Sequence, residues 1–222
     1  MQLPRILSNP VYPPRVSDEN MRKRIYCHRG LWVDPKDQNT IHAFKSAAKH
    51  GFGIETDLNH LNGQICVSHD IPESNAFLEI VELLQLEIPI ALNLKCDGLL
   101  PQLSQYRTSL LSTGSFVFDG SIPEMHKYQR ANFPHALRVS EFEKSLPWRP
   151  ASLWIDAFES EWWINEFRLI EEFGIKKIIF VSPELHGRNP EPAWEFLSSI
   201  WDDDLLEVQI CTDKPFEFMD HL

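Results

Sequence analysis

The sequence predicts an α/β protein, more specifically a compact (β/α)₈ barrel of the TIM type with a small hairpin excursion after its second strand. Short runs of apolar, β-branched residues alternate with segments of helical periodicity, which is typical of a parallel sheet with helical crossovers. Eight such runs follow one another, which is the strand number of this barrel. The chain has 222 residues, of which 43% are hydrophobic, so a single domain can bury a sizeable core.

Residues 1–22 precede the first strand and are expected to form a proline-rich arm. Proline lacks the backbone donor and restricts the residue before it, so this segment is not expected to contain a regular helix or a central strand. Residues 23–222 are expected to form one barrel domain. The eight predicted barrel strands are residues 24–28, 53–58, 88–95, 115–119, 136–140, 153–157, 177–182 and 207–212.

The first crossover carries clear helix signals. Asn39 or Thr40 can cap a helix, and Gly51 can end it. After the second strand, residues 61–68 add a small strand, with Asn62-Gly63 as a hairpin turn. This hairpin is expected to deliver the histidine and aspartate that follow it.

The later connections differ in length. Trp163, Phe167 and Ile170 recur at helical spacing between the sixth and seventh strands, and Pro192 suits the first turn of the next helix. The fifth connection, residues 141–150, holds two prolines and is too short for a full helix.

Charge and cysteine usage exclude several classes of function. With 21 Lys and Arg against 32 Asp and Glu, the formal net charge is −11, so a nucleic-acid partner is not expected. Phosphate chemistry then needs a small positive pocket or a bound metal. The four cysteines form no C-x-x-C pair, so neither a zinc knuckle nor a redox motif is present. No apolar run is long enough to span a bilayer, which predicts a cytoplasmic protein without stable membrane insertion.

Two carboxylates on the second strand are the strongest chemical signal. Side chains alternate along a strand, so Glu55 and Asp57 point to the same face. Burying two acids together without compensation costs on the order of several kcal/mol each. A cation or an ion-pair partner is therefore expected, and oxygen ligands of this kind suit Mg or Ca. The alternative, that both acids lie at the solvated end of the barrel without a role, stays open.

Neighbouring strand ends supply complementary groups. Asn93 can offer an oxygen to a metal, and Lys95 a positive charge to a phosphate oxygen. His28, beside Arg29 at the end of the first strand, and His69 can act as general base and general acid near neutral pH. Active sites of such barrels are built at the C-terminal ends of the strands, where these residues fall.

Other polar or aromatic residues at strand ends are weaker candidates for contacts with a substrate. Trp32 can pack on a substrate ring or acyl chain, and the others can contact substrate hydroxyls or the metal. These candidates are Trp32, Asp119, Asp156, Glu184, His186 and Arg188.

The motifs over residues 24–70, about a fifth of the chain, resemble the glycerophosphodiester phosphodiesterase family, within the superfamily of phosphatidylinositol-phospholipase-C-like barrels. The matching motifs are His28-Arg29-Gly30, Asn39-Thr40, Ala43-Phe44, Ala47-Ala48, Gly51, Glu55-x-Asp57, Gly63 and Val67-x-His69-Asp70. The resemblance implies one divalent cation held by Glu55, Asp57 and a third acid. It also implies catalysis by His28 and His69, with Arg29 as a phosphate clamp.

The chain departs from that family pattern at two places. Asp37-Gln38 stands where the family usually has Pro-Glu, and Asn93 stands where it has the first acid of a Glu-x-Lys motif. An amide in place of a carboxylate lowers the charge of the site by one, so metal affinity should fall unless another acid, Asp119, Asp156 or Glu184, contributes.

The sequence thus predicts a phosphoric diester hydrolase that cleaves a small glycerol- or sugar-type phosphodiester with a divalent cation, Mg or Ca. Arg29 and Lys95 would bind the phosphate. One alternative, motivated by Asn93, is a weakened or inactive barrel that binds a phosphorylated ligand. Another is a glycosidase with paired carboxylates, against which stand the histidines and the arginine that such chemistry does not need. The two alcohols, the choice of metal and the oligomeric state stay open.

Overall fold

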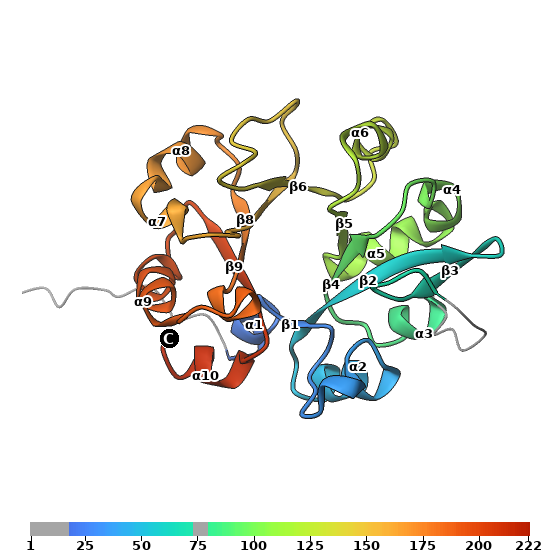
Figure 1. The fold of residues 1–222 in the computed structure, drawn as a ribbon, viewed down its shortest axis with the longest axis horizontal. Helices are drawn as coiled ribbons and strands as arrows, with labels where there is room; N and C mark the ends of the chain where they lie inside the picture. The colour runs from blue at the N-terminus through green and yellow to red at the C-terminus, as the bar shows by residue number, and fades with distance from the viewer. Residues whose placement is uncertain (1–17, 73–79) are drawn as a thin grey trace, which may run out of the picture.

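The structure is a computed structural model that describes residues 18–72 and 80–222. Eight parallel strands form a nearly closed barrel with helices between them, which confirms the predicted fold class (Figure 1). Residues 1–17 of the predicted arm lie outside the described residues. The barrel strands are β1 (Ile25–His28), β2 (Gly53–Leu61), β4 (Ile90–Leu94), β5 (Phe116–Phe118), β6 (Ala136–Val139), β7 (Ser152–Ile155), β8 (Lys177–Val181) and β9 (Glu207–Thr212).

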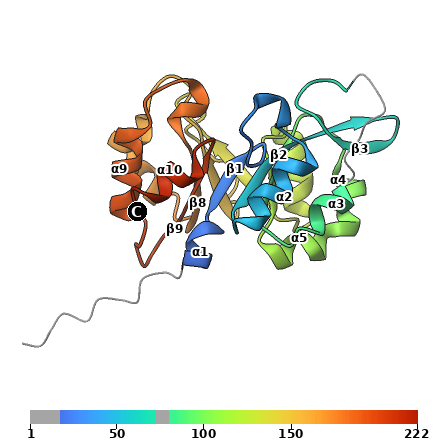
Figure 2. The ribbon, with the colours of Figure 1, turned by 90° about the horizontal axis from the view of Figure 1, so that it is seen from below.

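The predicted excursion after the second strand is present. β3 (Gln64–Val67) pairs antiparallel with the end of β2, and the two strands project from the side of the barrel (Figures 1 and 2). Asn62 and Gly63 both have positive φ angles, 51° and 85°. Two successive positive φ angles define a type I′ turn, which matches the twist of a hairpin.

Short helices surround the strands. The α-helices are α1 (Asp18–Arg22), α2 (Ile41–Lys49), α3 (Ile80–Leu84), α4 (Leu100–Leu103), α5 (Arg107–Thr113), α6 (Ile122–Arg130), α7 (Trp162–Asn165), α8 (Phe167–Glu172), α9 (Glu191–Ile200) and α10 (Pro215–Met219). Three 3₁₀ segments are η1 (Pro35–Asp37), η2 (Ser104–Tyr106) and η3 (Pro183–His186). No helix of residues 18–72 and 80–222 is long and apolar enough to cross a membrane.

Two predictions about helical segments need correction. Residues 18–22, within the lead-in expected to lack regular helix, form α1, because the four prolines of the lead-in all precede position 15. The single helix predicted around Trp163 and Phe167 is two helices, α7 and α8. Glu166, between them, has φ −110° and ψ 23°, outside the helical region.

Among neighbouring barrel strands, β5 and β6 have the shortest backbone pairing, and we call the boundary between them the seam. These strands are joined by one bridge, Val117 to His135, and by a 3.0 Å hydrogen bond from Val117 N to Pro134 O. Pro134 has no N–H, so the pairing cannot continue on the side of the bridge that precedes His135. The seam separates α6 from the β6–β7 side of the ring in Figure 1.

Apolar side chains form two layers. Inside the barrel, Phe118 stacks on Trp154 with ring centroids 3.9 Å apart, and Tyr26 packs edge-on against Phe116. The larger layer lies between the strands and the helices, where the predicted core tryptophans Trp162, Trp163, Trp194 and Trp201 are all buried. The barrel interior is therefore packed, which leaves its C-terminal mouth as the place for a site.

Candidate active site

Glu55 and Asp57 lie on the inner face of β2 and are buried. Asp57 Oδ2 accepts a 2.8 Å hydrogen bond from Asn39 Nδ2, and Asp57 Oδ1 lies 3.1 Å from Lys95 Nζ. Arg29 Nε is 3.1 Å from Asp57 Oδ2, close enough for an ion pair although its angle does not make a hydrogen bond. Burial alone would raise the pKa of Asp57, but the Lys95 charge and the Asn39 and Arg29 contacts outweigh it and lower that pKa. The charged Asp57 carboxylate therefore holds the cationic side chains of Lys95 and Arg29 in place.

The negative charge of Glu55 has fewer compensating partners than that of Asp57. Its Oε2 accepts a 3.3 Å hydrogen bond from the backbone N–H of Arg29. Burial, together with the nearby charge of Asp57, raises the pKa of Glu55 to about 7. The Glu55 carboxyl can thus gain or lose a proton near neutral pH, and a bound cation would favour its charged form.

The turn after β1 aims Arg29 at this acid pair. Arg29 and Gly30 both have positive φ angles, 55° and 90°. A Cβ on Gly30 would lie 2.8 Å from Ala43 Cβ, so only glycine lets the turn approach α2 this closely. The turn places the backbone N–H of Arg29 on Glu55 and its guanidinium near Asp57.

Asn39 has a different local role from the one its cap signal indicated. Thr40 is the N-cap of α2, accepting from Ala43 N at 3.3 Å. Asn39 adopts a positive φ of 57° and donates to Asp57, while its Oδ1 accepts a 2.9 Å bond from Thr56 Oγ1. Asn39 therefore connects the β1–α2 loop to β2 by two hydrogen bonds.

His28 is oriented by a residue that sequence reasoning missed. His28 Nδ1 lies 2.9 Å from Asp213 Oδ1, in the loop after β9. Burial would lower the pKa of His28, but the Asp213 hydrogen bond and the charges of Glu55 and Asp213 prevail, so this pKa is raised. Because Nδ1 is engaged, Nε2 is the nitrogen free to exchange a proton with a ligand.

His69, after the hairpin, is more exposed than His28. Its Nδ1 lies 2.9 Å from Asp70 Oδ1, and its side chain is 46% exposed. The adjacent Asn59 donates to Asp70 O at 3.1 Å and holds this segment against the barrel.

A cavity of about 390 Å³ at the C-terminal end of the barrel brings most of the predicted site residues together. The predicted residues that line it are His28, Arg29, Glu55, Asp57, His69, Asn93, Lys95, Asp119, Asp156 and His186. Its volume lies in the range of small-molecule sites, about 300–1,000 Å³.

Three predicted residues stand behind the cavity rather than on its lining. Trp32 Nε1 donates to His28 O at 3.0 Å. Glu184 accepts from Thr212 Oγ1 and, at 3.2 Å, from Asp213 N, so it holds the segment that orients His28. Arg188 pairs with Glu161 Oε1 at 2.8 Å and holds the loop after β7.

Residues of the opposite strands were missed by sequence reasoning. Arg138 on β6 and Phe158 after β7 line the cavity, as do Phe118 and Trp154 on its floor. Arg138 is the third residue of a four-residue strand, so its alternation with Leu137 and Val139 was the available signal. Asp213 directly follows the last strand, at the end where barrel sites form.

The donor set on β2 and β4 suits a hard cation only with help from an amide. No three His, Cys, Asp or Glu side chains of the described chain are grouped to hold a metal ion. Asn93 is the register partner of Asp57, and its buried Oδ1 has no hydrogen-bond partner among the described residues. A buried oxygen in that state is open to a cation or to a donor on a ligand, whereas both oxygens of Asp57 already have partners in Lys95, Asn39 and Arg29.

Comparisons with known proteins find similarity in structure. No protein-family model matches the chain, and no curated protein sequence matches it. A glycerophosphodiester phosphodiesterase from Agrobacterium tumefaciens superposes with a TM-score of 0.64 at 16% identity, covering 89% of this chain and 98% of that one. The same enzyme type from Thermotoga maritima has a TM-score of 0.57 at 18% identity, covering 89% and 97%.

A third similar structure carries a ligand. It is an Oleispira antarctica phosphodiesterase in complex with the product sn-glycerol-3-phosphate, with a TM-score of 0.57 at 14% identity, covering 89% of this chain and 96% of that one. At these identities the likeness is one of fold, and over most of its length the chain adopts the barrel fold of these three phosphodiesterases.

Proposed function

We propose that this protein is a divergent member of the glycerophosphodiester phosphodiesterase family and hydrolyses a small glycerol- or sugar-type phosphodiester. The observation that carries the proposal is the cavity at the C-terminal end of the barrel. It collects two histidines, two buried acids and two cationic side chains from β1, β2, β4 and the hairpin. The shared fold with three phosphodiesterases, one of them holding sn-glycerol-3-phosphate, supports it.

Arg29 and Lys95 would bind the phosphate. Both line the cavity, and both are held by contacts with Asp57 at 3.1 Å. A fixed arginine can bind two phosphoryl oxygens through its planar fork, and a lysine adds a compact charge. Cations held in place before the reaction stabilise the charge that develops on the phosphoryl oxygens.

His28 and His69 would carry out the proton transfers. One histidine takes the proton of the attacking water or substrate hydroxyl, and the other protonates the leaving alcohol. Each ring has one nitrogen engaged by an aspartate, Asp213 for His28 and Asp70 for His69, which leaves the other nitrogen for the substrate. The hydrogen bond to Asp213 and the charges of Glu55 and Asp213 raise the pKa of His28, which favours its protonated form.

Glu55, Asp57 and Asn93 would hold a divalent cation, Mg or Ca. When bound, the cation supplies Lewis-acid polarisation of a phosphoryl oxygen. Asp57 already contacts Lys95 and Arg29, so this chain balances its acids partly with its own cations. We therefore expect a lower metal affinity than three carboxylates would provide.

The test is hydrolysis of a glycerophosphodiester and of bis(p-nitrophenyl) phosphate, with Mg²⁺, with Ca²⁺ and with a chelator. We expect turnover that the chelator abolishes and that His28→Ala and His69→Ala each lower by about 10² or more. His42→Ala, at an exposed position on α2, is the matched control and should retain full activity. Turnover that survives both active-site substitutions, or no turnover under any condition, would contradict the proposal.

A barrel that binds a phosphorylated ligand without turnover is the second candidate. It is favoured by the amide of Asn93 and by the pairing of Asp57 with Lys95, which already neutralises that carboxylate. Calorimetric binding of inorganic phosphate, unchanged by a chelator and without hydrolysis of either diester, would support this candidate over the first.

A further inference from the structure

The seam leaves a gap in the barrel wall beside the candidate active site. β5 and β6 are joined by the bridge from Val117 to His135, whereas β4–β5 and β6–β7 pair over three and four residues. Within residues 18–72 and 80–222, no backbone pairing joins β5 to β6 closer to the mouth of the barrel. A fully paired wall confines a ligand to the mouth, but a wall with this gap can let part of a ligand leave sideways.

Two cavities, of about 190 and 360 Å³, lie along this gap. They share Ile122, Leu137, Arg138 and Glu143 in their linings, so they form one continuous groove between the start of α6 and the β6–β7 loop. We call it the seam groove. Its smaller part shares Asp119 and Arg138 with the cavity of about 390 Å³ that collects the predicted site residues, the active-site cavity. The seam groove therefore begins at the edge of the active-site cavity.

The seam groove has an apolar surface that continues into the active-site cavity. Ile122 is 50% exposed and Phe142 is 66% exposed, which is unusual for side chains of this size. The ring centroid of Phe142 lies 6.1 Å from that of Phe158, which lines the active-site cavity. Exposed apolar surface that is contiguous in this way is typical of a ligand-binding groove. The apolar lining of the seam groove consists of Ile122, Met125, Leu137, Phe142, Leu146 and Pro147.

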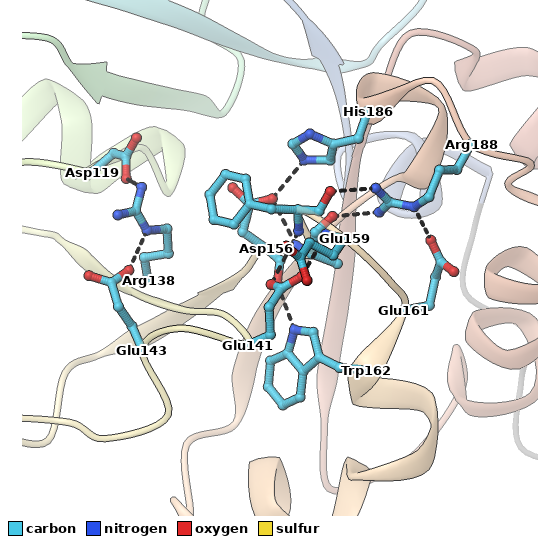
Figure 3. A network of polar contacts seen from close by, with 12 residues as sticks. Asp119, Arg138, Glu141, Glu143, Asp156, Glu159, Glu161, Trp162, His186 and Arg188 are labelled. Carbon is cyan, nitrogen blue, oxygen red and sulfur yellow. Dashed lines mark hydrogen bonds and ion pairs between the residues drawn. The ribbon is translucent and has the colours of Figure 1, made fainter.

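The charged residue at the border between the two cavities is neutralised by its own neighbours. Arg138 Nη1 donates to Asp119, and Arg138 Nε donates to Glu143 at 2.7 Å, so one cation lies between two carboxylates (Figure 3). An uncharged segment of a ligand can cross this border without leaving an unpaired charge, provided that these ion pairs stay in place. The border therefore does not require a charged group on the ligand.

Both walls of the seam groove are held in place. Ser140 and Glu143 exchange backbone hydrogen bonds of 3.2 and 3.1 Å, which fold the start of the β6–β7 loop back on itself. Lys144 Nζ lies 2.7 Å from Glu166 Oε2 and connects this loop to α8. On the other wall, Ser121 is the N-cap of α6. A groove whose walls are already ordered loses less conformational entropy when a ligand binds.

We propose that the seam groove binds an apolar chain attached to one alcohol of the substrate, so that the protein acts on a phosphodiester with an alkyl or acyl chain. The proposal rests on the proposed function, because Arg29 and Lys95 must hold the phosphate in the active-site cavity. The chain would pass Phe158 and then cover Ile122 and Phe142. The continuity of the groove with the active-site cavity favours a part of the substrate as its occupant over a separate partner.

The test compares the binding of methyl, butyl and octyl phosphate by isothermal titration calorimetry, at concentrations where octyl phosphate is monomeric. The three ligands carry the same phosphate, so their affinities differ only through the chain. Each methylene that becomes buried tightens binding by about twofold to fourfold. We therefore expect octyl phosphate to bind at least about tenfold more tightly than methyl phosphate, with butyl phosphate between them.

Two kinds of variant locate the chain. Ile122→Ser and Phe142→Ser should each lower the octyl advantage by about threefold or more, because they remove apolar surface that the chain covers. Ser145→Trp places a large side chain at an exposed position of the groove lining and should remove most of that advantage. All three variants should bind methyl phosphate within about twofold of the unmodified protein.

The matched control is Leu205→Ser. Leu205 is 74% exposed, precedes β9 and lies outside the described lining of the seam groove and of the active-site cavity. This variant should bind all three ligands as the unmodified protein does. The proposal is overturned if octyl phosphate binds no more tightly than methyl phosphate. It is also overturned if Ile122→Ser, Phe142→Ser and Ser145→Trp keep the full octyl advantage, because the chain would then lie elsewhere.

Hydrolysis of methyl and octyl p-nitrophenyl phosphate separates this proposal from the proposed function. Chain-dependent binding without hydrolysis of either diester would retain the seam groove as a chain site and contradict the phosphodiesterase. Hydrolysis of both diesters without chain-dependent binding would do the reverse. The absence of binding by all three phosphate monoesters would overturn the chain site together with the phosphate site.

Discussion

Asp213 Oδ1 lies 2.9 Å from His28 Nδ1, although the two residues are 185 positions apart in the chain. β1 and β9 are parallel neighbours, so the residues that follow them meet at the same end of the barrel. Glu184 in turn accepts a hydrogen bond from Asp213 N. The first and last barrel strands therefore build one oriented histidine between them.

Asp213→Asn should lower the pKa of His28, because the variant removes the carboxylate that favours the imidazolium form. The His28 ring resonance in an NMR titration checks this, with assignment by His28→Ala. Turnover should fall by about 10- to 100-fold, the usual effect of losing an orienting partner. Asp220→Asn, at the exposed end of α10, should change neither quantity. An unshifted His28 pKa would show that Asp213 does not set its charge.

Glu55→Gln should stabilise the metal-free protein at alkaline pH. The pKa of Glu55 is about 7 in the folded chain and 4.5 in its ordinary state, so between these values the folded state binds more protons than the unfolded one. The free energy of unfolding contributed by this group therefore falls as pH rises through that window. Glutamine stays neutral and escapes this loss, on the order of 1–3 kcal/mol at pH 8.

Urea unfolding at pH 5 and pH 8, with a chelator present, measures the effect of Glu55→Gln. The variant should gain more stability at pH 8 than at pH 5. Glu217→Gln, at an exposed position on α10, should show no such difference. Equal effects of Glu55→Gln at both pH values would mean that Glu55 does not titrate in this range.

Asn93→Asp should raise the affinity for Mg²⁺ or Ca²⁺ by about tenfold, because a third carboxylate adds charge to the ligand set. Calorimetric metal titration of the purified protein gives the two dissociation constants. Asn189→Asp adds the same charge on an exposed loop and should leave them unchanged. If Asn93→Asp does not tighten binding, the divalent ion is not held at this pair of strands.

Gly30→Ala should destabilise the fold by more than Gly98→Ala does. Both glycines have positive φ angles, 90° and 93°, so both substitutions strain the backbone. The added Cβ meets Ala43 at 2.8 Å in the first case and nothing within 4 Å in the second. We expect about 1–3 kcal/mol more loss for Gly30→Ala in urea unfolding. Equal losses would mean that α2 can shift away from the turn.

Local patterns in the sequence predicted most of the architecture correctly. Strand–helix alternation identified all eight barrel strands, and the Asn62-Gly63 pair identified the hairpin. The two-residue period of a strand placed Glu55 and Asp57 on one face, because that period depends only on the backbone. Thr40 as a helix cap follows from the same kind of short-range chemistry.

Other features follow from contacts between distant segments, and local patterns did not reveal them. The Glu166 break between α7 and α8 coincides with 2.7–2.8 Å contacts to Lys144, a residue 22 positions away. Asp213 carries no motif, since a lone aspartate after a strand is common. The roles of His28 and His69 in catalysis remain predictions, to be decided by the activity measurements.

The sequence by itself determined that this chain is a barrel with two acids, two histidines and two cations at its strand ends, because strand alternation and turn chemistry act within a few residues. Only the tertiary structure decided which of these groups compensate one another. Closing the sheet brings Lys95 and Arg29 onto Asp57 and leaves Glu55 with a pKa near 7. It also places Arg138 beside Asp119 and Asp213 beside His28. Electrostatic compensation depends on distances between side chains in space, and those distances are set only when the barrel forms.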